Sequence, residues 1–258
     1  MEKLKEIWKY RQMIVGLVRR DLRGRYKGSV LGFLWTFINP LLQLVVYTMV
    51  FSVIMRAGID KYSLFLFVAL IPWIFFSTSV AGGCGCVLYH QDMVTKIYFP
   101  REVLPIAHVT TGFVNMLYSF IVVFAVVVFC RVPLNFLALL CLPAIMVVEY
   151  VLSLGMALIV SALTVYFRDL EHIMSIVIMA WQFLTPVMYS IDQVPEVVRP
   201  LFRLNPMTNI ILAYRDVLYY GRVPQMQTLL SCVAFGVGAL IIGILIFEKL
   251  QRRFAEEL

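Results

Sequence analysis

A stripe of polar and aromatic side chains follows one face of an apolar stretch. Residues 29–55 contain no Asp, Glu, Lys or Arg, and five of their side chains would fall within about 120° of one another on a helix. These are Trp35, Thr36, Asn39, Gln43 and Tyr47. Amides and hydroxyls facing lipid cost free energy, so the stripe must face protein or a water-filled path. It predicts either hydrogen bonds between helices or a pathway lining in which aromatic faces stack on sugar rings and amides bond hydroxyl groups.

Three further aromatic side chains extend this candidate path. Trp73 and Phe76 lie in the apolar run 62–89, and Trp181 lies in the run 173–191. Aromatic side chains also gather at membrane interfaces for reasons unrelated to a path. Their assignment to the path therefore depends on the stripe on the first run.

Motifs for catalysis and metal binding are absent from the sequence. It contains no GxxxxGK[ST], HExxH, CxxC or GxSxG, and its three histidines are scattered. Glu149 is the one acid inside an apolar run. It is either a proton-relay group or, as we favour without a second acid nearby, a protonated or hydrogen-bonded packing residue. We expect a chain that is not an enzyme and binds no metal or cofactor.

The composition is that of an integral membrane protein. Hydrophobic residues make up 62% of the 258 residues and charged residues only 14%, against about a quarter charged in globular proteins. Crossing the hydrocarbon takes about 20 apolar residues. Six runs meet or approach this length: 29–55, 62–89, 103–130, 132–167, 173–191 and 226–247. We predict an all-α protein with six transmembrane helices in one domain, residues 1–258, whose six-span region is 29–247.

The two ends of the chain are predicted to lie in the cytoplasm. Residues 1–28 are basic and amphipathic, which indicates a helix lying on the membrane surface near lipid phosphates. With the N-terminus inside, roughly two thirds of the Lys and Arg fall on the cytoplasmic side, together with a tail at 248–258. The net charge of +7 then reflects membrane asymmetry, and we expect no nucleic-acid partner.

Two connections stand out from the short turns between runs. Residues 89–105, "YHQDMVTKIYFPREVLP", permit a short helix ending at a rigid proline corner, or an ordinary polar loop. Residues 192–224 are too charged to span the membrane and too apolar for a solvated loop. Four prolines cut this segment, so we predict two short helices in or dipping into the outer interface, a level that suits Tyr214, Tyr219 and Tyr220.

Four motifs in order resemble the membrane subunits of type-2 ATP-binding-cassette exporters for polysaccharides, the group that moves O-antigen-like glycans and teichoic acids. They are "RDLRGRYKGSVLGFLWTFINPLLQ", "KIYFPREVLP", "VYFRDLEHI" and "TPVMYSIDQVPEVVRPLFRLNPM". The resemblance covers nearly the whole chain. It implies a homodimer in the inner membrane of a bacterium, with a lipid-linked glycan as substrate. It also implies two copies of a separate ATPase subunit, which would bind the ATP and Mg. An exporter of teichoic acid, or of a small lipid or drug, is the alternative.

The resemblance also implies roles for two groups of residues. Coupling to the ATPase would involve Lys96, Tyr98, Phe99, Pro100, Arg101, Glu102, Arg168 and Asp169. An exit gate would involve Pro195, Pro200, Phe202, Asn205 and Pro206.

Overall fold

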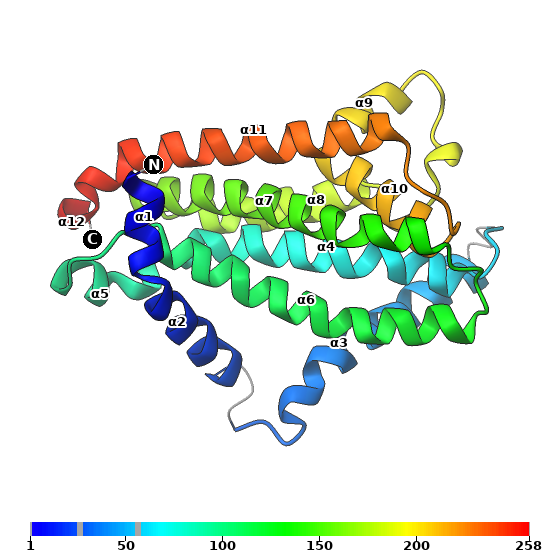
Figure 1. Ribbon diagram of the computed structural model, residues 1–258, viewed down its shortest axis with the longest axis horizontal. Coiled ribbons are helices and arrows are strands. Elements are labelled where there is room, and N and C mark those ends of the chain that lie inside the picture. Colours follow the sequence, from blue (N-terminus) through cyan, green and yellow to red (C-terminus); the bar gives the residue numbers. More distant parts are fainter. Residues whose placement is uncertain (1, 25–27, 55–57, 258) are drawn as a thin grey trace.

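The computed structural model describes residues 2–24, 28–54 and 58–257, and the described residues contain helices, turns and no strand. Four long helices lie side by side along the molecule (Figure 1). They are α4 (Tyr62–Gly85), α6 (Val103–Phe129), α7 (Phe136–Tyr166) and α11 (Met226–Leu250). The short helices α5 (Gln91–Lys96) and α12 (Phe254–Glu257) lie at one end of these four, close to both chain termini.

Within the described ranges, five helical segments are long and apolar enough to cross a membrane. They are Gly32–Ser52, Tyr62–Gly85, Val103–Phe129, Phe136–Tyr166 and Met226–Arg253. The first contains α3 (Trp35–Thr48) and part of a π-helical continuation, Met49–Ile54.

The sixth expected span, residues 173–191, is helical only in its first part. The apolar helix α8 (Leu170–Phe183) has 14 residues, and at 1.5 Å per residue its length is about 21 Å, less than the hydrocarbon thickness. Pro186 offers no N–H for a helical bond, and the chain turns at this point, with the Val187 N–H bonded to the Thr185 carbonyl at 2.7 Å. Helix α8 alone is too short to cross the hydrocarbon, so a sixth crossing would have to include the turn at residues 184–187.

Helix α4 is the centre of the bundle. It packs against α3, α6, α7, α8 and α10, and 78% of its most apolar stretch is buried inside the protein. A helix that is apolar on all sides suits this position, because every face meets another helix. The other long helices leave much of their apolar surface exposed.

Helices α7 and α11 cross at glycine. A Cβ on Gly155 would collide with the backbone of Ala239, and one on Gly243 would collide with the backbone of Gly155. Small residues at such a crossing let two membrane helices approach until their backbones touch. The last span is therefore held closely to the fourth.

The N-terminal segment forms two helices where we expected one. Helix α1 (Glu2–Lys9) is followed after Tyr10 by α2 (Arg11–Gly24). Helix α2 packs against α6, its Leu17 is buried, and Ile14 and Val18 of the expected apolar face pack against the same core. Part of the apolar face that we assigned to the membrane surface thus lies on the protein itself.

The segment after α8 contains the expected pair of short helices, but the second one lies deep in the protein. Asn205 caps α10 (Pro206–Leu218) by accepting a bond from the Met207 N–H, and Pro206 suits the first helical position. Eleven residues of α10 are buried, whereas α9 (Arg199–Leu204) has none. Both helices lie at the end of the molecule opposite α5 (Figure 1).

Candidate functional site

A polar cavity of about 490 Å³ opens between α3, α4 and α6. Trp35, Thr36, Asn39 and Gln43 line it from α3, so four residues of the stripe share one hollow. The other lining residues are Ser29, Pro40, Ile71, Ile74, Phe75, Thr78, Gly112, Asn115, Met116 and Ser119. None of the described lining residues carries a charge, so this part of the lining is polar but electrically neutral.

Hydrogen bonds inside the cavity leave several amides available. Trp35 Nε1 donates to Ser29 Oγ at 3.0 Å, and Thr78 Oγ1 donates to the Ile74 carbonyl of its own helix at 2.7 Å. The side chains of Asn39 and Gln43 are exposed. The site can therefore offer amide donors and acceptors beside an indole face, which is the chemistry that a hydroxyl-rich ring would use.

The remaining path candidates lie elsewhere. Tyr47 is half-buried and packs against the central core. Trp73 and Phe76 are buried inside the subunit, and Phe76 meets Trp181 edge to face at 5.1 Å. None of these four lines the cavity of the stripe. Trp73, Phe76 and Trp181 instead form an aromatic group between α4 and α8.

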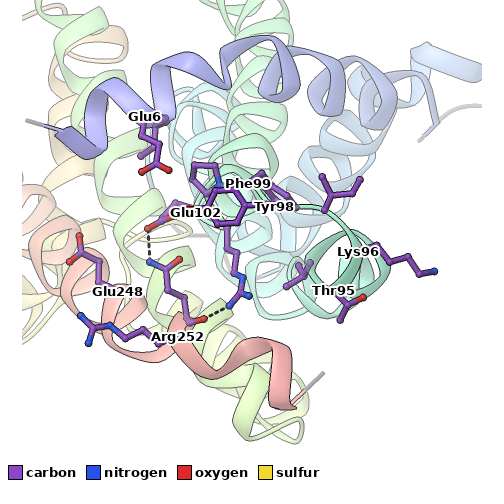
Figure 2. A pocket seen from close by; sticks show the side chains of 14 residues that line it. Glu6, Thr95, Lys96, Tyr98, Phe99, Glu102, Glu248 and Arg252 are labelled. Atoms are coloured by element: carbon purple, nitrogen blue, oxygen red, sulfur yellow. Dashed lines mark hydrogen bonds between the residues drawn. The ribbon is translucent and has the colours of Figure 1, made fainter.

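A second cavity, of about 700 Å³, lies at the end of the molecule that carries both termini. Residues 94–102 form one wall, and Glu6, Ile7, Glu248, Gln251 and Arg252 complete it (Figure 2). Six of the expected coupling residues, those between positions 96 and 102, share this cavity.

The six expected coupling residues of this loop fall into two groups, one exposed and one turned toward the protein. Lys96 and Tyr98 are exposed, with 87% of Tyr98 accessible. Arg101 and Glu102 turn inward to the C-terminal segment. Arg101 donates to the Gln251 carbonyl, and Gln251 Nε2 donates to Glu102 Oε1 at 2.8 Å (Figure 2). Phe99 is buried and Pro100 half-buried between these groups.

Arg168 and Asp169 occupy a separate turn between α7 and α8. Both side chains are exposed, and neither lines the 700 Å³ cavity. A bond from Tyr89 Oη to Glu171 Oε1, 2.8 Å long, connects this turn to the chain just after α4. The bond to this carboxylate raises the pKa of Tyr89 above its ordinary value, because it favours the protonated phenol.

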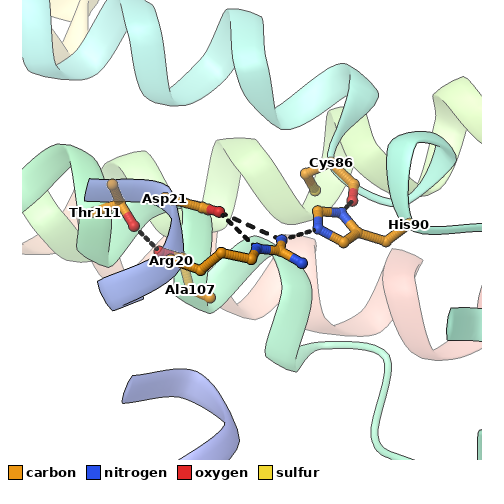
Figure 3. Close-up of polar contacts among 6 residues, drawn as sticks. All are labelled: Arg20, Asp21, Cys86, His90, Ala107 and Thr111. Carbon is orange, nitrogen blue, oxygen red and sulfur yellow. Dashed lines mark hydrogen bonds and ion pairs between the residues drawn. The ribbon is translucent and has the colours of Figure 1, made fainter. Parts of the chain in front are cut away.

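His90 connects the same region to the N-terminal helices. Its Nδ1 lies 2.9 Å from the Cys86 carbonyl, and its Nε2 lies 2.5 Å from an Arg20 nitrogen (Figure 3). A carbonyl only accepts, so Nδ1 carries the proton and Nε2 accepts from Arg20. This contact fastens α2 to the end of α4.

Of the expected gate residues, Asn205 forms a polar junction. Asn205 donates to the Leu184 carbonyl and to Thr185 Oγ1, and it accepts from Trp181 Nε1 at 2.9 Å. Phe202 contacts the ring of Tyr189, Pro195 and Pro200 are exposed, and Pro206 begins α10. Asn205 thus joins α10 to the end of α8.

Two buried polar contacts were missed by sequence reasoning. Tyr214, which we expected at the outer interface, is fully buried on α10 and donates to Glu149 Oε2 at 2.6 Å. The neighbouring Arg215, 1% exposed, bonds the carbonyls of Val187 and Tyr189 and lies over the Phe65 ring. The available signal was the adjacent charged pair Arg215 and Asp216 in a segment too apolar for a loop.

The fold and cavity describe a multi-pass helical membrane protein with a neutral polar hollow among its spans. Residues 12–219 match the ABC-2 type transporter family, and the chain belongs to that family. It is 37% identical to the O-antigen export system permease protein RfbA of Myxococcus xanthus over 99% of this chain and 98% of that protein. A Klebsiella pneumoniae protein of the same description is 32% identical over 95% and 94%. The polysialic acid transport protein KpsM of Escherichia coli is 22% identical over 91% and 92%.

Proposed function

We propose that this chain is the membrane-spanning subunit of an ATP-driven exporter that moves lipid-linked, O-antigen-like polysaccharide across the cytoplasmic membrane of a bacterium. The observation that carries the proposal is the neutral polar cavity between α3, α4 and α6, where amides and an indole lie among membrane spans. The descriptions of the relatives as an O-antigen export permease and a polysialic acid transport protein favour polysaccharide over a small lipid or drug.

The energy for transport would come from a partner. A chain without a phosphate-binding loop has no such means of holding ATP, and family membership implies an ATPase subunit in the complete exporter. We propose a homodimer of this chain with two such ATPase copies, which bind the ATP and Mg. ATP drives movement only if it binds with different affinity to two conformations of the assembly.

The ATPase would dock at the end of the molecule that carries both termini. Lys96 and Tyr98 project from this end, and Arg168 and Asp169 are exposed in their own turn. We assign this end to the cytoplasm, which puts both termini inside, and the junction around Asn205 to the outer side as part of an exit gate. Movement at the docking surface would then reach the cavity through α4, which ends at Gly85, and α6, which begins at Val103, on either side of the segment that carries Lys96 and Tyr98.

Reconstitution tests this assignment. The chain is purified alone and with the ATPase subunit encoded beside it, and ATP hydrolysis and delivery of lipid-linked polysaccharide into vesicles are measured. We expect hydrolysis and delivery only from the two together. Hydrolysis by the isolated chain, or a complete assembly that moves a small lipid but no polysaccharide, would contradict the proposal.

A further inference from the structure

Asn115 is a buried amide with no hydrogen-bond partner among the described residues. It lies on α6, the third span, and both polar atoms of its side chain are inaccessible to bulk solvent and unbonded. Buried polar groups in native proteins nearly always have partners, since leaving one unsatisfied costs free energy. An amide that keeps both its donor and its acceptor free in a membrane span therefore needs an explanation.

The cavity beside α3 lies next to that amide, whose covered polar atoms would reach a ligand there once the side chain turns toward the cavity. Asn115 lines it together with Asn39 and Gln43, and about 490 Å³ falls in the size range of small-ligand sites. Gly112, one turn before Asn115, also lines the cavity and has no side chain to fill it. A Cβ at Gly112 would lie 3.3 Å from the ring of Phe75.

The lining selects the class of ligand. Three amides from two helices offer both donors and acceptors, and Trp35 and Phe75 offer aromatic surface. A phosphate or another anion would need a cationic partner, and the lining residues that the structure describes include none. A purely apolar molecule would leave the amides unsatisfied. An uncharged ring with hydroxyl groups on its edge and an apolar face fits both features.

We propose that Asn115 is a glycan-binding residue, whose amide donates to and accepts from the hydroxyl groups of one sugar unit inside this cavity. The inference rests on the proposed function and extends the binding surface from α3 to the third span. It also puts a sugar-binding position within a single subunit.

The test replaces the amide by an apolar side chain of similar size, Asn115→Leu. Removing an unpartnered buried amide should leave the thermal stability of the purified protein unchanged or higher. Export per folded transporter at limiting lipid-linked polysaccharide should fall about tenfold, because the hydrogen bonds to the sugar are lost. Stability and export thus move apart, which an interhelical packing role would not produce.

Thr48→Val is the matched control. Thr48 Oγ1 is also buried without a partner among the described residues, but Thr48 does not line the cavity. Its replacement should leave export at the wild-type rate. Asn115→Ala, which removes the amide without introducing a larger group, should repeat the loss of export if the leucine variant folds poorly.

The outcomes separate this inference from the function on which it rests. Wild-type export per folded molecule by both Asn115 variants would overturn the role of Asn115 while the exporter assignment stands. Loss of export only in proportion to loss of folded protein would also overturn it. A wild-type assembly that moves no polysaccharide would instead refute the proposed function.

Discussion

Trp35 and Tyr47 share one face of α3 and yet have different surroundings. Trp35 lines the polar cavity, whereas Tyr47 packs against the core around α4. Periodicity placed both on one stripe, but a helix face can meet a cavity in one turn and a neighbouring helix three turns later. Substitutions at Trp35 and Tyr47 can therefore distinguish a role in binding from a role in packing.

Trp35→Ala should lower export several-fold while the melting temperature changes little, because it removes a stacking surface beside open space. Tyr47→Ala should lower the folded yield first. Truncating a fully buried aromatic side chain costs about 3–5 kcal/mol, and half-buried Tyr47 should lose part of that. Export per folded transporter and thermal unfolding in detergent measure both effects. The reverse ordering would show that Trp35 is the packing residue.

The pair Glu149 and Tyr214 supports a second test at the residue scale. Tyr214→Phe removes the donor to a fully buried carboxyl group and should destabilise the fold by about 1–3 kcal/mol. Glu149→Gln keeps an acceptor for Tyr214 and should change stability less. Thermal unfolding compares the two. Loss of transport in Glu149→Gln without loss of stability would favour the proton-relay role over packing.

At the scale of elements, the loop 97–102 and the end of α11 form one unit. Arg101 bonds the Gln251 carbonyl and lies over the Phe254 ring, with 5.7 Å from its guanidinium carbon to the ring centre. Phe254 itself is fully buried and contacts Tyr166 and Phe247. Two of the expected coupling side chains thus connect the loop to the last span, whereas Tyr98 is exposed and Lys96 pairs with Asp92 of its own helix at 3.1 Å.

Exchanging the partners across this unit tests the connection. Gln251→Glu sets a carboxylate against Glu102 and should reduce the amount of polysaccharide exported per ATP hydrolysed. The double variant Glu102→Gln with Gln251→Glu restores an amide-to-carboxylate bond and should recover most of it. Lys249→Gln, an exposed change of the same charge, is the control. Failure of the double variant to recover would show that this bond does not carry the coupling.

At the scale of the whole molecule, both described ends of the chain lie together, and α9 lies at the other end (Figure 1). Single cysteines at Lys249 and Glu196, both exposed positions, can report the sidedness in a background without the five native cysteines. A membrane-impermeant thiol reagent applied to intact cells with a permeabilised outer membrane should label position 196 and leave position 249 unlabelled. Labelling of 249 from outside would invert the proposed topology.

The sequence by itself determined the class of protein and most of its elements. Apolar runs that are long enough to cross a bilayer must form helices, since the backbone has no other way to satisfy its polar groups there. The helical stripe on α3 likewise predicted four of the residues that line the cavity, because Trp35, Thr36, Asn39 and Gln43 follow one helical face.

Tertiary structure decided which polar groups meet. Asn115 on α6 joins Asn39 across a cavity, Tyr214 meets Glu149 on another span, and Arg101 turns toward Gln251, all pairs separated by at least 65 positions in the chain. Periodicity describes one helix at a time, whereas these contacts depend on how helices rotate and cross. It also gave no measure of depth, so α10 was placed at the interface although its capped, apolar turns pack deep among α4, α7 and α11.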